Sequence, residues 1–208
     1  MSENKILPEN KPDALVVGGG PAGLMAAQQL IEAGCSVVLC DAMPAVGRKL
    51  LRAGVGGLNL THAEPKAEFV SRFTGSVDVA PWLEDFDAQA MTAWARALGI
   101  DTFVGSSGRV FPVQMKASPL LRAWLGQLAL AGLQIRNRYR WCGWTQTADG
   151  MVHEFTPTGQ VQIAARVCVL ALGGASWSRL GSDGRWRDVL SAHTIPVTDF
   201  MPSNGGVE

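Results

Sequence analysis

The chain has 208 residues, 47% of them hydrophobic, and its 18 basic and 18 acidic side chains give a formal net charge of zero. This length suits one or two domains with a sizeable core. Without a basic excess the chain is a poor match for nucleic acid or an anionic membrane, and no apolar run reaches membrane-spanning length. Because the N-terminus also lacks an apolar signal region, we expect a soluble, cytoplasmic protein with no nucleic-acid or membrane partner.

The first predicted elements form a strand–turn–helix–strand unit. A polar lead-in precedes it at residues 1–13. The unit itself consists of an apolar strand at 14–17, a glycine-rich turn at 18–23, a helical stretch at 24–33, and an apolar strand at 37–40 closed by Asp41. This order is typical of a dinucleotide-binding βαβ unit.

Each part of the turn has a physical task in such a unit. Gly18 permits the sharp turn after the strand, Gly20 has no Cβ to keep a pyrophosphate away, and Gly23 lets the helix lie close to the strand. The N–H groups at the start of the helix face the phosphates. Asp41 is placed to accept hydrogen bonds from both hydroxyls of the adenosine ribose. The alternative is a glycine turn that only packs the helix on the strand.

Several further elements are predicted before residue 133. They are a glycine-rich basic loop at 44–62, helices over 64–99, short strands at 102–104 and 109–112 around a turn, and a helix that ends at Gly132. The helical spacing of the aromatic residues in 64–99 favours core packing. Ser118 and Pro119 are a preferred N-cap and first-turn pair for the last helix.

The remaining elements favour FAD over NAD. The patterns predict a strand at 133–135, three antiparallel β segments at 139–147, 151–156 and 160–164, and a buried strand at 167–172 ended by Gly173 and Gly174. A β-meander as the crossover into the last strand is typical of FAD domains of the glutathione-reductase superfamily type. A second glycine-rich turn for NAD(P)H is absent from the sequence. We predict an α/β fold: a Rossmann-like FAD-binding domain with a helical insertion, divided at 1–63, 64–132 and 133–208.

The cysteines and histidines predict neither a disulfide nor a metal site. Cys35 and Cys40 bracket a strand, where residues five apart lie about 16 Å from each other, beyond disulfide reach. We expect reduced, largely buried thiols. The histidines, His62, His153 and His193, have no ligand spacing.

Several motifs resemble those of the BaiN/YhiN-type flavoproteins, also called aminoacetone-oxidase-like NAD(P)/FAD-dependent oxidoreductases. They extend over nearly the whole chain in the family's order. The matching segments are Gly-Gly-Gly-Pro-Ala-Gly at 18–23, Gly-Arg-Lys-Leu-Leu at 47–51, Gly-Gly-Leu-Asn-Leu-Thr-His at 56–62, Gly-Arg-Val-Phe-Pro at 108–112, Lys-Ala at 116–117, Ala-Leu-Gly-Gly-Ala-Ser at 171–176, Gly-Ser-Asp-Gly at 181–184 and Pro-Ser-Asn at 202–204.

The resemblance implies a set of FAD contacts. The pyrophosphate lies at 20–23 with Arg48 and Lys49 beside it, the ribose at Asp41, the flavin side along 59–61, and the adenine against backbone at 141–143. The predicted cofactor-binding residues are Gly18, Gly20, Pro21, Ala22, Gly23, Asp41, Ala42, Arg48, Lys49, Asn59, Leu60, Thr61, Cys142, Ala171, Gly173 and Gly174. For Arg48 and Lys49 the alternative is a solvated basic loop. For Arg109 a turn-stabilising surface role is as good an interpretation as a substrate contact.

The sequence departs from the family pattern at two places. Many members have Gly-Gly-Gly-Arg-Cys-Asn where this chain has Gly-Val-Gly-Gly-Leu-Asn at 54–59, so any role of that arginine and cysteine is in doubt. Members also continue past the Pro-Ser-Asn segment into a β-rich substrate domain and a last segment beside the flavin. We therefore expect a truncated chain that binds FAD weakly, without turnover.

The predicted function is that of an FAD-dependent oxidoreductase, in which flavin N5 exchanges a hydride with a small-molecule substrate or NAD(P)H. No catalytic acid or base is assigned. One alternative is an NAD(P)-dependent dehydrogenase, but the single tyrosine, Tyr139, has no lysine four residues later. The other is an inert nucleotide-binding fragment.

Overall fold

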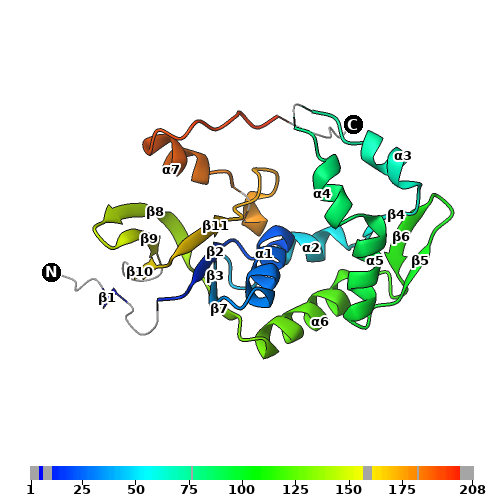
Figure 1. Cartoon of the computed structure of the whole chain (residues 1–208), viewed down its shortest axis with the longest axis horizontal. Helices are drawn as coiled ribbons and strands as arrows, with labels where there is room; N and C mark the ends of the chain where they lie inside the picture. The colour runs from blue at the N-terminus through cyan, green and yellow to red at the C-terminus, as the bar shows by residue number, and fades with distance from the viewer. Residues whose placement is uncertain (1–4, 7–10, 76, 157–160, 182, 202–208) are drawn as a thin grey trace. The chain divides into compact units, whose positions relative to one another are not determined.

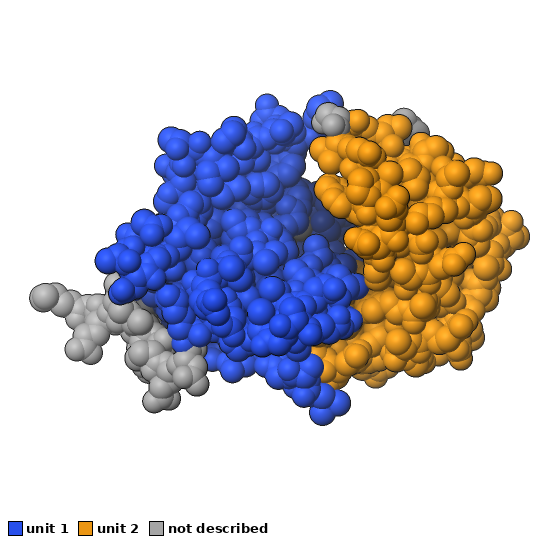
Figure 2. Space-filling view, in the orientation of Figure 1, with its two compact units in different colours: residues 1–49, 129–208 blue, residues 50–128 orange. Residues whose placement is uncertain are grey.

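The computed structural model describes residues 5–6, 11–75, 77–156, 161–181 and 183–201. Ser182, the segment 202–204 and residues 157–160, with the first residue of the strand predicted at 160–164, lie outside them. The chain divides into two compact units (Figure 2): residues 1–49 with 129–208, here called unit 1, and residues 50–128, called unit 2. Unit 2 is thus inserted into the sequence of unit 1. The boundaries at 63 and 132 stay predictions.

A parallel four-stranded sheet is the centre of unit 1. Its order is β11 (Val167–Leu170), β2 (Ala14–Val17), β3 (Val37–Asp41) and β7 (Gln134–Asn137). Helix α1 (Pro21–Glu32) packs on β2 and β3 and buries Leu24 and Ala27 (Figure 1). Because Leu15 and Val16 of β2 are both fully buried, this strand is covered on both faces. The predicted α/β Rossmann-type fold is confirmed.

The last strand of this sheet differs from its prediction. The apolar run at 167–172 predicts a buried strand, but β11 ends at Leu170 and lies at the sheet edge. Val167 is 51% exposed and Leu170 38% exposed. An edge strand has one neighbour, so its apolar side chains stay partly open to solvent. Cys168 and Leu172 nevertheless pack against the core, which accounts for the apolar pattern.

The predicted β-meander forms a second sheet in unit 1. Strands β8 (Arg140–Thr147), β9 (Gly150–Thr156) and β10 (Val161–Ala164) pair antiparallel in chain order. Strand β1 (Lys5–Ile6) joins β10 in parallel, within the segment predicted as a lead-in. Pairing with the exposed edge of β10 places these two residues in the sheet despite their polar surroundings in the sequence.

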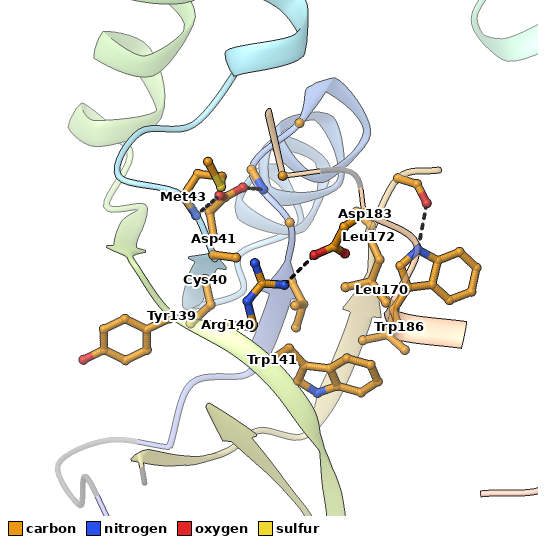
Figure 3. Close-up of a pocket in the computed structure, with 18 of the residues that line it drawn as sticks. Cys40, Asp41, Met43, Tyr139, Arg140, Trp141, Leu170, Leu172, Asp183 and Trp186 are labelled. Atoms are coloured by element: carbon orange, nitrogen blue, oxygen red, sulfur yellow. Dashed lines mark hydrogen bonds and ion pairs between the residues drawn. The ribbon is translucent and has the colours of Figure 1, made fainter. Parts of the chain in front are cut away.

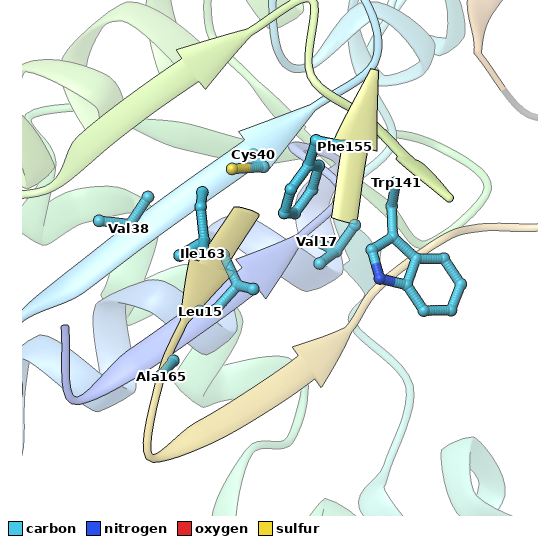
Figure 4. Close-up of a cluster of buried hydrophobic side chains, with 8 residues drawn as sticks. All are labelled: Leu15, Val17, Val38, Cys40, Trp141, Phe155, Ile163 and Ala165. Atoms are coloured by element: carbon cyan, nitrogen blue, oxygen red, sulfur yellow. The ribbon is translucent and has the colours of Figure 1, made fainter. Parts of the chain in front are cut away.

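One hydrophobic core joins the two sheets (Figure 4). Its buried residues are Leu15, Val17, Val38 and Cys40 from the parallel sheet and Trp141, Phe155, Ile163 and Ala165 from the meander and the residue after it. Alternation along β2 and β3 turns these side chains to one face and leaves the other face to α1. The sheet therefore lies between a helix and a second sheet.

Unit 2 is mainly helical, with a small antiparallel sheet. Its elements are β4 (Thr61–His62), α3 (Lys66–Ser71), α4 (Ala80–Asp85), α5 (Ala88–Ala97), β5 (Thr102–Val104), β6 (Arg109–Pro112) and most of α6 (Ala117–Leu130). Its core contains Leu58, Ala95, Ile100, Ala117 and Leu120. The helices and two strands agree with the sequence prediction.

Two local predictions need correction. The segment at 44–62, predicted as a loop, contains helix α2 (Arg48–Ala53). Its residues are good helix formers, and Gly47 and Gly54 flank them. Helix α6 begins at Ala117, so Ser118 lies inside the first turn instead of capping it. Pro119 is still compatible with that turn because it needs no intrahelical N–H bond there.

Candidate nucleotide-binding site

A cavity of about 730 Å³ lies at the carboxyl ends of β2, β3 and β11 in unit 1 (Figure 3). Besides these strand ends, its walls come from the start of α1, the start of α2, the start of β8, and helix α7 (Trp186–Ala192). In parallel α/β sheets, ligands bind in the crevice outside the carboxyl ends of the strands. The cavity occupies this position.

The glycine turn between β2 and α1 is tight. Gly18 has φ +108°, and a Cβ there would overlap the carbonyl oxygen of Ala171. Its N–H donates to the carbonyl of Cys40 at 2.8 Å. A Cβ on Gly23 would overlap the carbonyl of Gly18. These two positions require glycine for chain packing, whatever the ligand.

Gly20 differs from its neighbours because a Cβ there would meet no atom within 4 Å. It is the N-cap of α1, makes no side-chain cap bond, and is followed by Pro21 at the first helical position. The first N–H groups of an α-helix have no intrahelical partner, and the positive end of its dipole favours an anion. Since residues 17–22 line the cavity, this helix start opens into it.

The carboxylate of Asp41 holds two loops together. It accepts hydrogen bonds from the N–H of Gly19 at 2.6 Å and of Met43 at 2.7 Å. Each carboxylate oxygen keeps further acceptor capacity for a ligand hydroxyl. Sequence reasoning assigned Asp41 only a ribose contact and missed this bracing role. The bond to Met43, two residues later, is an Asx-turn, which an aspartate at a strand end could have suggested.

The basic side of the cavity comes from the start of α2. Arg48 and Lys49 line the cavity, and Lys49 Nζ donates to Ser176 Oγ at 3.2 Å. Nε of Arg48 is buried and has no hydrogen-bond partner among the described residues. A buried donor without an acceptor is costly, and an anionic ligand would satisfy it.

The opposite side of the cavity is apolar. Leu170, Leu172, Trp186, Val189 and Leu190 line it together with Trp141. The indole N–H of Trp186 donates to the carbonyl of Gly173 at 3.0 Å. These side chains come from β8, from β11 and the residues after it, and from α7, so three separate segments enclose a surface suited to a flat aromatic group.

Trp141 is held by a buried histidine behind it. Its Nε1–H donates to Nδ1 of His153 at 3.3 Å. Burial lowers the pKa of His153 below its usual value, so the ring stays neutral at pH 7 and can accept this bond. The partner of Trp141 was not predicted, because the two residues lie on neighbouring strands and not in one motif.

An ion pair also lies at the cavity. Nη1 of Arg140, the first residue of β8, is 3.0 Å from Oδ2 of Asp183, which precedes α7. Nε of Arg185 is 3.9 Å from the same oxygen. All three residues line the cavity. The Gly-Ser-Asp-Gly motif contains Asp183, but nothing in it indicates Arg140 as the partner.

The four cysteines are free, as far as the described residues show. Burial raises the pKa of Cys40 and of Cys168 to about 12. Cys142 is exposed at an irregularity of β8, so the expectation of largely buried thiols is wrong for this residue. Its side chain is exposed, whereas that of its neighbour Trp141 is buried in the core.

Most predicted cofactor-binding residues come together at this cavity. Those that line it are Gly18, Gly20, Pro21, Ala22, Asp41, Ala42, Arg48, Lys49, Cys142, Ala171 and Gly173. Gly23 lies behind the turn, and Gly174 is not part of the lining. Asn59, Leu60 and Thr61 belong to unit 2, and Arg109 is exposed there on β6. Sequence reasoning missed Arg140, Asp183 and the α7 residues.

Comparison with known proteins gives one family and many similar folds. The family model for the HI0933-like protein Rossmann domain matches residues 12–208. Three similar structures are a 3-ketosteroid-Δ4-(5α)-dehydrogenase from Rhodococcus jostii RHA1 (TM-score 0.62, 15% identity, 85% of this chain and 48% of that one), THI4 from Thermovibrio ammonificans (0.51, 18%, 78% and 57%), and a flavocytochrome c3 fumarate reductase (0.58, 19%, 89% and 41%). At these identities the similarity shows the fold alone. The chain spans about half the length of these proteins.

Within the described part of the chain, no helix is long and apolar enough to cross a membrane.

Proposed function

Since the chain belongs to the HI0933-like Rossmann-domain family, whose fold is that of FAD-binding oxidoreductases, we propose that it binds FAD in the unit 1 cavity and acts as a flavoprotein oxidoreductase. The observation that carries this proposal is the open space beside the backbone of Gly20. At the other glycines of the turn a Cβ would overlap protein atoms, whereas at Gly20 it would meet none and lie in open space. A ligand group that needs close approach to the backbone explains the choice of glycine there.

The lining residues fit a dinucleotide in three parts. The N–H groups at the start of α1 and the partnerless Nε of Arg48 suit the pyrophosphate. The remaining acceptor capacity of Asp41 suits the adenosine ribose. The apolar wall with Trp141 and Trp186 suits the adenine. Contacts of Asn59, Leu60 and Thr61 with the flavin remain part of the proposal.

The charge of the cavity supports the same ligand. Among the residues that the structure describes there, four cations and two carboxylates line the cavity: Arg48, Lys49, Arg140, Arg185, Asp41 and Asp183. The excess of two positive charges matches the two negative charges of a pyrophosphate diester. Electrostatic complementarity of this kind favours association and selects against cationic ligands.

When bound, FAD supplies the redox chemistry, accepting a hydride at N5 from a small-molecule substrate or from NAD(P)H. The residues described above bind and orient its adenosine and pyrophosphate parts. Because the chain spans about half of the similar solved structures, the reaction of the whole protein, its substrate and the use of NAD(P)H are proposals.

The nucleotide can be identified directly. The 208-residue chain is purified and titrated with FAD, FMN and NAD⁺ in parallel, and the dissociation constants are compared. We expect weak binding, with FAD preferred over FMN and NAD⁺. Tighter binding of FMN than of FAD would contradict the proposal, because FMN lacks the adenosine that the apolar wall and Asp41 are proposed to bind. Tighter binding of NAD⁺, which shares the ADP part, would contradict the choice of FAD as the ligand.

A further inference from the structure

The ion pair between Arg140 and Asp183 has no role in the contacts considered so far, yet it lies at the cavity. Its two ends are 43 residues apart in the sequence and come from different elements. Figure 3 shows Arg140 reaching from β8 toward Asp183, with Asp41 above it and Leu170 of β11 to its right. The pair thus connects the two walls that enclose the adenosine side of the cavity.

Both ends of the pair are anchored. On the Arg140 side, the N–H groups of Arg138 and Tyr139 donate to the carbonyls of Met43 and Asp41, at 3.0 and 2.9 Å. These bonds fasten the start of β8 to the loop after β3. The position of Arg140 is therefore set by the same loop that carries the ribose acceptor.

On the Asp183 side, Oδ1 accepts the N–H of Arg185 at 3.2 Å. Helix α7 then begins at Trp186, whose indole N–H is bonded to Gly173. The helix also packs on β8, since a Cβ on Gly143 would lie 3.3 Å from Val189. The carboxylate is thus presented by a fixed turn and not by a loose loop.

From this geometry we propose that the Arg140–Asp183 ion pair closes the cavity over the adenosine half of the bound dinucleotide and slows its release. The inference rests on the proposed function, because it assigns the pair to retention of that ligand. The side chains are 43% and 18% exposed, so the pair has one side toward solvent and one toward the cavity. It can open without unfolding either wall.

Whether one substitution speeds or slows FAD release distinguishes this role from simple charge attraction. FAD is an anion, so removing the negative charge of Asp183 makes the cavity more positive and, by electrostatics alone, tightens FAD binding. If the carboxylate instead holds the closing arginine, its removal accelerates release. Asp183→Asn is suitable because the amide oxygen can still accept the N–H of Arg185 and preserve the turn.

The experiment mixes the FAD-loaded 208-residue chain with excess ADP, which competes for the adenosine and pyrophosphate part of the cavity, and follows FAD dissociation by the change in flavin fluorescence. We expect Asp183→Asn and Arg140→Gln each to release FAD about 1.5- to fivefold faster, the range for a partly exposed ion pair. The double variant should release it no faster than the faster single variant, because both changes remove one interaction.

The matched control is Arg166→Gln. It breaks the exposed ion pair between Arg166 and Asp13, 3.2 Å long, which is not part of the cavity lining. We expect this variant to release FAD at the wild-type rate. Thermal unfolding of all four variants, followed by circular dichroism, checks that the fold is retained.

The outcomes are distinct. Unchanged or slower release from Asp183→Asn, with wild-type protein that binds FAD, overturns the inference and leaves the proposed function intact. Additive effects in the double variant also overturn it, since two independent contacts would then act. Wild-type protein that does not bind FAD overturns the proposed function and this inference together.

Discussion

The two units use their apolar side chains differently. In unit 1 a core shared by two sheets is buried, and the polar groups at the strand ends converge on one cavity. In unit 2 the core is smaller, and several large side chains stay open, with Phe73 50% exposed and Trp82 64% exposed. Binding groups are most accurately placed on rigid elements. We therefore expect changes in unit 1 to alter nucleotide binding, and changes in unit 2 outside residues 59–61 to alter mainly stability.

The largest expected effect on FAD binding is that of Gly20→Val. A Cβ at Gly20 meets no protein atom within 4 Å, so the valine side chain is expected to occupy the space in which we propose that the pyrophosphate binds. We expect FAD affinity to fall about a hundredfold or more, equivalent to roughly 3 kcal/mol, while the circular dichroism spectrum is unchanged. Isothermal titration measures the affinity.

Gly126→Val in α6 is the control for that variant. A Cβ at Gly126 also meets no atom within 4 Å, but the residue is in unit 2. FAD affinity should be unchanged. Equal losses in the two variants would mean that the added bulk acts through the fold and not through the cavity.

Leu120→Ala tests the comparison of the two units with a change in unit 2. Leu120 is 1% exposed in the core of unit 2, and truncating a buried leucine typically costs about 2–5 kcal/mol of unfolding free energy. We expect urea denaturation to show this loss, with the FAD dissociation constant within twofold of wild type. A parallel loss of FAD binding would show that the two units are energetically coupled.

Asp41→Ala should have a smaller effect, on both binding and stability. It removes a ribose acceptor and leaves the N–H groups of Gly19 and Met43 without their partner. We expect FAD binding to weaken by about 1–3 kcal/mol, measured by titration. Asp13→Asn, whose carboxylate accepts the N–H of Ser36 away from the cavity, should bind FAD normally. Unchanged binding in Asp41→Ala would restrict Asp41 to its bracing role.

Mild acidification should lower the stability of unit 1 before that of unit 2. Burial lowers the pKa of His153 from its usual 6.5, so the unfolded chain takes up a proton at this residue before the folded chain does. The contribution of neutral His153 to the free energy of unfolding is complete above pH 6.5. It is lost as the pH falls toward the lower pKa of the folded state. In unit 2, N–H bonds from Ala90 and Gln89 lower the pKa of Asp87 below 3.8, so its contribution persists to lower pH.

His153→Gln provides the measurement for this prediction. Glutamine is neutral at all these pH values and keeps an acceptor for the indole N–H of Trp141. Urea denaturation at pH 7.5 and 5.5 should show a smaller difference in stability for the variant than for wild type. An equal difference would assign the pH dependence to other groups.

The parts predicted best from the sequence are those set by neighbouring residues. The turn at 18–23, α1 and Asp41 are encoded within about thirty residues, because glycine conformation, helix start and strand pattern are all local. The meander was also predictable, since its strands are consecutive and joined by turn residues. Site residues assigned by resemblance, such as Asn59, still await a test.

Features that depend on distant segments were not predictable. Residues 167–172 are apolar whether the strand is central or at an edge, and only the pairing of the whole sheet shows that β11 lies at the edge. The Arg140–Asp183 pair joins residues with unremarkable local patterns. The buried Nε of Arg48 likewise results from loop packing, which hydrophobic periodicity does not report.

The position of β2 also has a consequence for synthesis on the ribosome. β2 pairs with β11, so that Val17 lies opposite Leu170, about 150 residues later in the chain. At roughly 5–20 residues per second, this edge of β2 waits on the order of ten seconds for its partner. During that time a nascent chain presents an apolar strand edge, which is prone to pairing with other chains. Chaperone dependence and a narrow temperature range for soluble expression are the expected cellular costs of this topology.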